Sequence, residues 1–313
     1  MRENSMTEII TPPSEIVVPR RELIKPGWYL DMDNEKYHGS SGDSSSTCKI
    51  LMERTQENYK YNRDNPENKE TDTKSLGTAF HTLTLEPEKF DRDIIVRPVS
   101  IKQRRGADWE AFKKEAGNRT IITKVQLDKA NKMADNVRKN PVAKALIDDG
   151  VKESSIYWWY KSTEFEDDYA GEYQTMCKVR PDFLSFSMPV VVDLKSADDP
   201  GETAFLKAMN TYYYHLSGAM YLEGVNQCKE LHNKTGHFAY NAFVYIVVDN
   251  NPPHEVKVYE LGEEDRAYGL QLFRRAMRLI HEGKRDDWPS YSLDITKTEM
   301  VRTLPWATKL PSI

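Results

Sequence analysis

Two aspartates and a lysine stand at the ends of two short apolar runs in the middle of the chain. Asp182 precedes the run at residues 183–186, and Asp193 lies near the end of the run at residues 190–194. Lys195 follows Asp193 by two positions, and residues i and i+2 of an extended strand point to the same side. The pattern therefore predicts two adjacent buried strands whose polar ends bring two carboxylates and an ammonium together.

A group of charges at the end of buried strands is costly to remove from water unless something compensates it. A divalent cation bound by Asp182 and Asp193 would do so, and carboxylate oxygens are ligands that Mg²⁺ prefers. Leu194, between the two charged positions of the second strand, would face the core. The sequence therefore predicts a magnesium site at this edge of the sheet.

The composition is that of a globular protein with a substantial core. The chain has 313 residues, 39% of them hydrophobic, and its 44 basic and 49 acidic side chains give a net charge of −5. Any contact with nucleic acid must therefore come from a local basic patch. Cys48, Cys177 and Cys228 are scattered, which argues against a disulfide framework and a zinc site and fits a reducing cytoplasm. We find no apolar run near 18 residues and no signal-peptide pattern, so we expect a cytoplasmic protein without membrane segments.

The hydrophobic periodicity predicts one domain in which helices and strands are mixed. We expect a poorly ordered arm at residues 1–26, a single domain at 27–313, and a loosely structured C-terminal tail within it. The expected helices are 44–61, 74–85, 123–140, a segment from 200 through 209, 215–232 and 263–284, and the expected strands are 154–160, 172–179, 183–186, 190–194, 238–248 and an edge strand at 256–259.

The pattern of a proline-aspartate pair followed by D-x-K is weak by itself. The segments Asp72–Lys74 and Glu255–Lys257 carry similar spacings, and a surface ion pair at a strand end would also explain Asp193 and Lys195. The three valines before Asp193 favour the buried strand. No phosphate-binding loop, dinucleotide fingerprint, H-E-x-x-H or G-x-S-x-G motif occurs, so metal-assisted phosphodiester hydrolysis is the chemistry that remains.

The layout of these residues resembles the PD-(D/E)XK nuclease superfamily, and within it the exonuclease VIII (RecE) family of phage and prophage recombination. The resemblance covers roughly residues 37 to 307 and is specific only when its segments are taken together. These segments are Y-H at Tyr37, G-T-A-F-H-T-L-x-L-E-P-E-K-F from Gly77, E-S-S-I-Y-W from Glu153, C-K-V-R-P-D from Cys177, V-D-L-K from Val192, and L-P-W-A near the end.

The resemblance implies an α/β fold of the restriction-endonuclease type, with a mixed central sheet flanked by helices. It also implies a Mg²⁺-dependent exonuclease, with Mn²⁺ as a substitute, that degrades one strand of double-stranded DNA from 5′ to 3′. Such an enzyme would act on DNA ends as a ring-shaped homo-oligomer, a trimer or tetramer. Its partner would be a RecT-like single-strand annealing protein, in the cytoplasm of a bacterial host.

The family's site residues carry over to matching positions of this sequence. Asp182 and Asp193 match the metal-binding carboxylates, and Lys195 matches the catalytic lysine. His81 matches the active-site histidine, although a satisfied histidine beside an apolar helix face is the alternative. Glu153 matches a glutamate near the metals, and a solvated loop glutamate is its alternative.

Two further positions bear on the expected site. The Leu194 carbonyl is expected to complete the metal ligands supplied by the two aspartates. Relatives often carry Q-x-x-x-Y on the helix after the active-site strand, whereas this chain has Ser217 and Tyr221 at those positions. Tyr221 is therefore a predicted DNA contact, and the absence of the glutamine leaves that contact in doubt.

A polyanion requires concentrated positive charge on a protein whose net charge is −5. The first candidate is the loop with Lys102, Arg104 and Arg105, which follows the His81 helix closely. The arginines of the helix at 263–284 are a weaker candidate, since a solvated charged face explains them. A structure-selective or restriction-type endonuclease and a catalytically silent DNA-binding scaffold remain as alternative functions.

Overall fold

The computed structural model of the protein describes residues 21–66, 71–162 and 172–291. Most of the predicted arm (1–20), most of the predicted tail and the L-P-W-A segment at 304–307 lie outside these ranges. None of the helices in the described ranges has both the length and the apolar character needed to cross a membrane.

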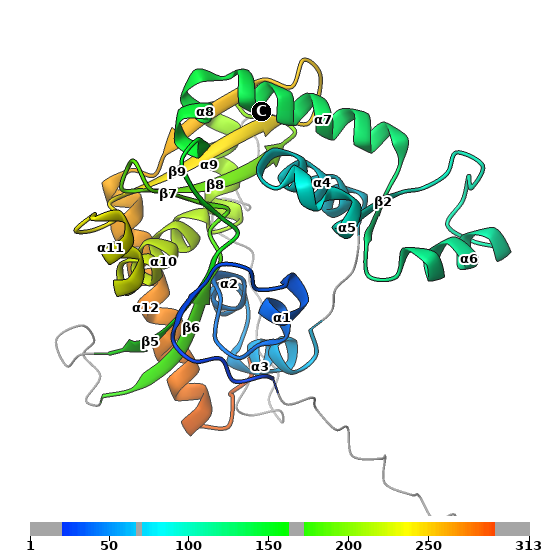
Figure 1. Cartoon of the computed structure of the whole chain (residues 1–313). Coiled ribbons are helices and arrows are strands. Elements are labelled where there is room, and N and C mark those ends of the chain that lie inside the picture. Colours follow the sequence, from blue (N-terminus) through cyan, green and yellow to red (C-terminus); the bar gives the residue numbers. More distant parts are fainter. Residues whose placement is uncertain (1–20, 67–70, 163–171, 292–313) are drawn as a thin grey trace, which may run out of the picture.

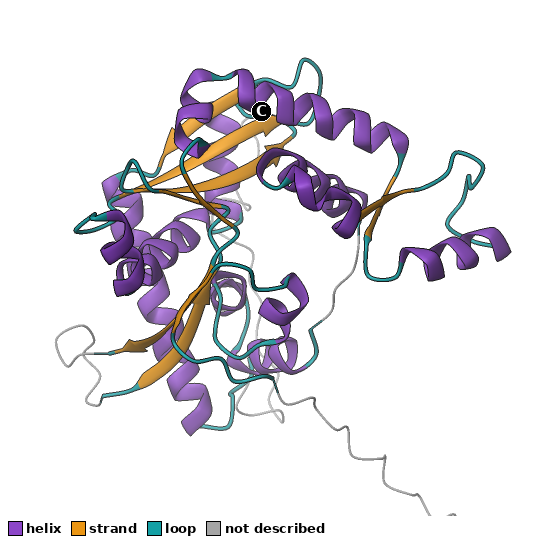
Figure 2. Cartoon of the chain, in the orientation of Figure 1, coloured by secondary structure: helices purple, strands orange, loops and turns teal. Residues whose placement is uncertain are grey.

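A mixed five-stranded sheet lies between helices in the upper part of Figures 1 and 2, and it confirms the predicted fold class. The strand order is β10-β9-β8-β7-β4; β8 pairs with β9 in parallel and all other neighbours are antiparallel. The predicted edge strand is β10, at one border of this sheet. The strands are β4 (Gly150–Lys152), β7 (Phe183–Ser185), β8 (Val190–Ala197), β9 (Ala242–Asp249) and β10 (Val256–Glu260).

Helices α4, α7 and α8 contact one face of this sheet (Figure 1). Their bounds are Asp72–Leu85, Lys124–Lys139 and Pro141–Ile147. Val192 and Leu194 of β8 pack with Phe80 of α4 and Met133 of α7 in one buried cluster. Two threonines cap the longer helices: the Thr71 hydroxyl accepts from the third amide of α4, and Thr123 forms a capping box in α7.

A second buried cluster lies on the opposite face, and the helices that contribute to it include three that follow β8 in the chain. These are α9 (Glu202–Thr211), α10 (Tyr214–Asn226) and α12 (Glu263–Arg285). Val191 of β8 and Tyr245 of β9 pack there with Phe273 of α12. Helices α10 and α12 approach closely at Gly269, where an added Cβ would lie 2.0 Å from the carbonyl oxygen of His215. The apolar positions of β8 thus alternate between two cores.

The predicted strands 154–160 and 172–179 form and pair, but they belong to a separate three-stranded sheet in the order β1-β5-β6. Pro181 lies between β6 and β7 and has no N–H to continue a ladder, so the chain leaves one sheet for the other. Helix α2 runs beside this sheet (Figure 1). The elements of this region are β1 (Gly27–Tyr29), β5 (Ser155–Lys161), β6 (Gln174–Val179), α1 (Asn34–Gly39), α2 (Ser45–Glu53) and α3 (Gln56–Asp64).

A small unit projects from the body beyond α4, with α6 at its tip (Figure 1). Its parallel strands β2 and β3 are joined through α6, and Trp109 and Phe112 of α6 pack against Ile121. The predicted basic loop lies between β2 and α6. The elements are η1 (Pro87–Lys89), α5 (Phe90–Asp93), β2 (Ile94–Val96), α6 (Ala107–Ala116) and β3 (Thr120–Ile122).

Two predicted helices are each divided in the structure. The segment 44–61 contains α2 and α3, because the Thr55 side chain accepts a hydrogen bond from the Asn58 amide at 3.2 Å and starts a new helix. The segment 215–232 contains α10 and α11 (Lys229–Thr235). At that break the Asn226 side chain bonds both the amide and the carbonyl of Tyr240, at 2.8 and 2.9 Å. Local polar side chains therefore end helices that the apolar periodicity continues.

Candidate metal centre

Three acidic residues lie in one row across the edge of three neighbouring strands. The pairing of β4 with β7 and of β7 with β8, extended by one position, places Glu153 beside Asp182 and Asp182 beside Asp193. The Glu153 amide donates to the Asp182 carbonyl at 3.1 Å, which continues the β4–β7 ladder to this row. Sheet register thus assembles carboxylates that are up to 40 positions apart in the sequence.

Helix α4 brings His81 to this row. Its Nδ1 atom lies 3.6 Å from Asp182 Oδ2, and ligand atoms of His81, Glu153 and Asp182 all lie within 4.8 Å of one another. All three residues are partly buried. Two carboxylates and an imidazole so arranged offer hard oxygen donors and one nitrogen, which suit a divalent cation such as Mg²⁺ or Mn²⁺. The donor set therefore fits the predicted metal.

Burial and mutual repulsion disfavour the charged form of the carboxyl groups at this site. Burial, with repulsion from Asp182, raises the pKa of Glu153 well above its usual value. Burial also raises the pKa of Asp182, and the Asp193 carboxylate adds to that effect. His81 and Lys195 act in the opposite direction and lower the pKa of Asp182. Additional positive charge here would relieve this repulsion, as bound cations do.

Asp193 lies next to this cluster but is engaged by Lys195. Its carboxylate is buried and forms an ion pair with the Lys195 ammonium, two positions along the same face of β8. Burial alone would lower the pKa of Lys195, but the carboxylates of Asp193 and Asp182 outweigh burial and raise it. The predicted convergence of Asp182, Asp193 and Lys195 is present in the structure. Within the described residues, the compact group of possible ligands is nevertheless His81, Glu153 and Asp182.

The backbone of Leu194 also faces the site. Its amide donates to Asp182 Oδ2 at 2.6 Å, while its side chain packs in the core on the α4 side. In an extended strand the N–H and C=O of one residue project toward the same neighbouring strand. The Leu194 carbonyl oxygen therefore faces the Asp182 side, as expected for an additional ligand.

Tyr221 approaches the carboxylates from α10. Burial raises the pKa of its phenol well above the usual value, and Asp193 and Asp182 are among the charges that add to this rise. Its ring packs edge-on against Phe243 at 5.9 Å between centroids. Ser217, the residue that replaces the family glutamine, lies one turn earlier on the same helix. The role of Tyr221 in DNA binding stays a prediction.

The predicted basic loop lies outside the metal cluster. Lys102, Arg104 and Arg105 are all exposed. Arg104 Nη2 is 2.6 Å from an Asp72 carboxylate oxygen at the start of α4, and Arg105 donates to Gln103. The loop is therefore tied to the helix that carries His81, with its cations open to solvent.

Sequence reasoning missed Arg180, which directly precedes the proline-aspartate pair. Its guanidinium donates to the Met32 carbonyl at 2.7 Å and to the Ser155 hydroxyl at 2.9 Å, and its charge lowers the pKa of Glu153. Arg180 Cζ also lies 4.3 Å from the centroid of the Tyr37 ring, so the guanidinium contacts the Y-H segment. The position of Arg180 could have indicated this role, because a cation next to a predicted carboxylate cluster lowers the pKa values of the carboxyl groups.

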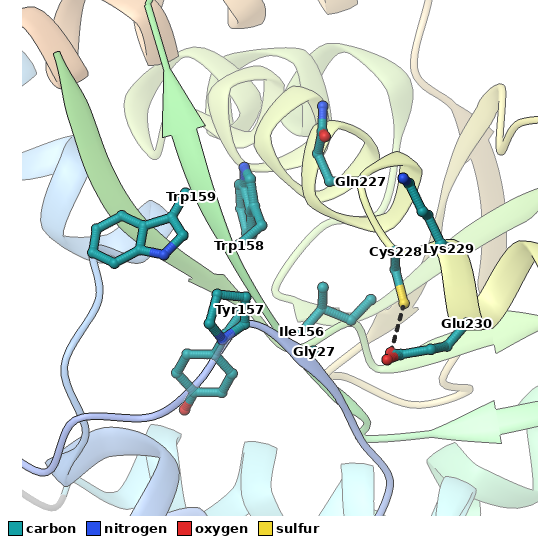
Figure 3. A pocket seen from close by; sticks show the side chains of 10 residues that line it. Gly27, Ile156, Tyr157, Trp158, Trp159, Gln227, Cys228, Lys229 and Glu230 are labelled. Carbon is teal, nitrogen blue, oxygen red and sulfur yellow. Dashed lines mark hydrogen bonds between the residues drawn. The ribbon is translucent and has the colours of Figure 1, made fainter.

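A pocket of about 300 Å³ lies elsewhere, between β5 and the start of α11 (Figure 3). Trp158, Trp159 and Glu230 are among the residues that line it, and no residue of the metal cluster does. The Glu230 carboxylate is used by the fold, because it accepts a hydrogen bond from the Trp28 amide at 3.2 Å. The pocket is therefore separate from the candidate metal centre.

Two solved structures match this chain to different degrees. A crystal structure of a "Putative exonuclease" from Eubacterium rectale has 14% sequence identity, covers 88% of this chain and 97% of that chain, and superposes with a TM-score of 0.53. At this identity the likeness concerns the fold alone. The crystal structure of SSO0001 has 13% identity over 65% of this chain and 86% of that chain, and its TM-score of 0.28 supports no argument. No curated protein matches the sequence.

Residues 44–299 match the family described as a PDDEXK-like domain of unknown function, DUF3799. The matched range is most of the chain and contains the whole row of acidic residues, His81 and Lys195. It confirms the predicted PD-(D/E)XK class and supports a nuclease. Enzymes of this class use divalent metals, in agreement with the donor set found here. The chain therefore belongs to the PDDEXK-like family DUF3799.

Proposed function

We propose that the protein is a metal-dependent exodeoxyribonuclease that degrades one strand of linear duplex DNA from 5′ to 3′. The observation that carries the proposal is the row of Glu153, Asp182 and Asp193, with His81 on one side and Lys195 on the other. A 3′ single strand left by this reaction would serve annealing-type recombination. The family match over residues 44–299 supports a nuclease, and the choice of an exonuclease follows from the sequence resemblance.

His81, Glu153 and Asp182 would hold the divalent cation, with the Leu194 carbonyl as an additional donor. When bound, the cation would polarise the scissile phosphate and lower the pKa of a water. Mg²⁺ is the expected ion, with Mn²⁺ as a substitute. Asp193 joins this site through its place beside Asp182 and through its ion pair with Lys195.

Lys195 would orient the attacking water and stabilise the negative charge that grows on the phosphate. Asp193 holds the ammonium in place, and the raised pKa of Lys195 keeps it charged at neutral pH. By analogy with donors that stabilise developing oxyanions, this role contributes about 2.7 to 4 kcal/mol to catalysis.

The proposal includes partners that follow from the resemblance. The enzyme would act on DNA ends as a ring-shaped homo-oligomer, a trimer or tetramer, together with a RecT-like annealing protein. The exposed loop with Lys102, Arg104 and Arg105 supports the DNA contact alone, because it could contact phosphates along the DNA without reading bases.

Incubation of the protein with linear and with closed circular duplex DNA, each with Mg²⁺, tests the activity. Loss of the linear form alone supports the exonuclease. Loss of both forms indicates an endonuclease, and loss of neither indicates a scaffold. Substrates labelled at the 5′ or the 3′ end then give the polarity, and early release of a 3′ label would contradict the 5′ to 3′ direction.

A further inference from the structure

Two lysines from different elements share one aromatic ring beside the metal centre. Lys195 Nζ of β8 lies 5.3 Å from the centroid of the Tyr214 ring, and Lys49 Nζ of α2 lies 5.5 Å from the same centroid. Tyr214 is the first residue of α10, and Asp193 and Lys195 both influence the pKa of its phenol. Lys49 is thus a second cation at the catalytic edge of the sheet.

Lys49 forms no ion pair with any of the described residues, although the carboxylates of Asp193 and Glu53 attract its charge at longer range. Glu53, one turn further along α2, is exposed and forms no ion pair with it in the described part of the chain. Lys195, by contrast, is paired with Asp193. Burial, together with repulsion from Lys195, lowers the pKa of Lys49 to about 8. Two ammonium groups, those of Lys49 and Lys195, therefore lie on the Tyr214 ring, and Lys195 is the one that is paired with Asp193.

A comparison with Lys178 shows how this fold treats a lysine that has only a structural role. Lys178 is buried, and its ammonium donates to the Tyr37 carbonyl at 2.6 Å, the Ser40 carbonyl at 2.9 Å and the Ser40 hydroxyl at 3.2 Å. All three donors of that ammonium are satisfied. Lys49 is only partly buried and, in the described ranges, makes no such hydrogen bonds. Its donors remain available to a ligand.

An exposed aromatic ring lies beside the ring that the two lysines share. Tyr212 is 56% exposed, and its ring lies 5.7 Å from that of Tyr214, centroid to centroid. The ring that both lysines contact is therefore next to an aromatic side chain on the protein surface. An ammonium is a compact point charge that binds phosphate well and cannot ligate a metal in its charged form.

We propose that Lys49 binds a backbone phosphate next to the scissile one on the strand that is degraded. The inference rests on the proposed nuclease function and adds a substrate-binding residue to that site. Both ammonium groups lie within 5.5 Å of one ring centroid, which is close enough for them to meet neighbouring phosphates of one strand. A strand whose scissile phosphate reaches Lys195 therefore carries a neighbouring phosphate to the second cation on the same ring.

DNA binding without cleavage tests Lys49 separately from catalysis. A fluorescent linear duplex is titrated with the full-length protein in EDTA at several salt concentrations, for the wild type, Lys49→Met, Lys49→Gln and Lys49→Arg. We expect Lys49→Met and Lys49→Gln to weaken binding severalfold and to reduce the slope of log Kd against log salt by about 0.9, the value for one phosphate contact. Lys49→Arg should keep the wild-type slope.

Lys60→Met is the matched control, because Lys60 lies on the neighbouring helix α3 and pairs with Asp64 at 3.2 Å. It should leave the slope unchanged. Thermal unfolding of each variant confirms that it is folded. Wild-type affinity and slope in a folded Lys49→Met or Lys49→Gln variant would overturn the proposal, whether or not the wild type cleaves DNA.

A cleavage assay then locates the phosphate. Single neutral methylphosphonates are placed on either side of the scissile position, and cleavage with Mg²⁺ is compared between the wild type and Lys49→Met. At one position neutralisation should slow the wild type about tenfold or more and have no further effect on the variant. Equal sensitivity of both proteins at every position would contradict the assignment. A wild type that cleaves no substrate refutes the nuclease, and the binding test still decides Lys49.

Discussion

The Glu153 amide donates to the Asp182 carbonyl at 3.1 Å, and this bond fixes the two carboxyl groups side by side on neighbouring strands. Glu153 has a φ of +46°, in the left-handed region that is unfavourable for residues with a side chain. Its side chain is nevertheless directed to His81 and Asp182 rather than to solvent. The fold thus tolerates local backbone strain where three possible metal ligands meet, which is common at functional sites.

The stability of the metal-free protein should fall as pH rises above about 4.5, the usual pKa of a glutamate. Because the pKa values of Glu153 and Asp182 are raised in the folded state, that state holds protons which the unfolded chain has already released. The free energy of unfolding therefore decreases as pH rises from the usual pKa to the raised one. Thermal unfolding in EDTA between about pH 4.5 and pH 8 measures this slope.

Mg²⁺ should restore the stability at the upper end of this pH range and have little effect at the lower end, where protons compete for the ligands. Glu153→Gln removes the carboxyl group whose pKa is raised well above its usual value. In EDTA it should therefore flatten the dependence of the free energy of unfolding on pH. A metal-free protein whose melting temperature rises with pH through this range would refute the electrostatic account of the site.

Replacement of Lys195 by methionine should lower the rate of DNA cleavage about 100-fold to 1000-fold, because the charge on the phosphate loses its partner. The change also leaves Asp193 as a buried carboxylate without its ion pair, so the melting temperature should fall. Asp193→Asn/Lys195→Met removes both charges and should recover stability without recovering activity. Wild-type cleavage by Lys195→Met or Asp193→Ala would show that the assignment is wrong.

His81→Ala should weaken metal binding by about tenfold or more, since it removes the nitrogen donor of the cluster. The His81 side chain is 28% exposed, so the loss of packing should be small. Isothermal titration with Mn²⁺ measures the affinity, and circular dichroism checks the fold. Thr78→Ala, at an exposed position one turn earlier on α4, is the control and should bind the ion normally. Equal affinity of both variants would exclude His81 as a ligand.

Simultaneous replacement of Lys102, Arg104 and Arg105 by alanine should weaken DNA binding and reduce its salt dependence by up to about three phosphate contacts. The Arg104–Asp72 pair is exposed, and such pairs contribute little to stability, so folding should be unaffected. The matched control removes three exposed lysines of α7 and α8, Lys132, Lys139 and Lys144, and should keep the wild-type salt slope. An unchanged salt slope in the folded loop variant would place this loop outside the DNA path.

Gly269→Ala should lower the free energy of unfolding by about 1 to 3 kcal/mol, because the new Cβ would overlap the backbone of α10 at His215. Gly77→Ala is the opposite case. Gly77 lies inside α4 with nothing within 4 Å of an added Cβ. The higher helix propensity of alanine should therefore raise the free energy of unfolding of the protein by up to about 1 kcal/mol. Chemical denaturation measures both, and a neutral Gly269→Ala would contradict the close packing of α10 on α12.

Local patterns predicted most elements that carry the site. The valines before Asp193 predict a buried strand, and β8 places Asp193 and Lys195 on one side and Leu194 in the core, as alternation requires. The apolar spacing of 74–85 predicts α4, which begins two residues earlier because Thr71 caps it. These elements can be predicted from the sequence because the spacing of apolar residues along a single segment indicates whether it forms a helix or a strand.

Other features depend on partners that are distant in the chain. No local pattern showed that β4 would pair with β7, so Glu153 could equally have been a solvated loop residue. Strands β5 and β6 were predicted, but only the chain's departure at Pro181 assigns them to a separate sheet. Pairing partner and register are set by long-range packing, which periodicity does not encode.

The types of charge at the ends of the central strands can be read from the amino-acid sequence, as can the resemblance to the PD-(D/E)XK superfamily that the match over residues 44–299 confirms. How those charges are grouped depends on the folded chain: His81, Glu153 and Asp182 together, Asp193 with Lys195, and Lys49 on the ring of Tyr214. The physical reason is that electrostatic interactions depend on distance and burial in space, and both are set by the packing of helices on the sheet.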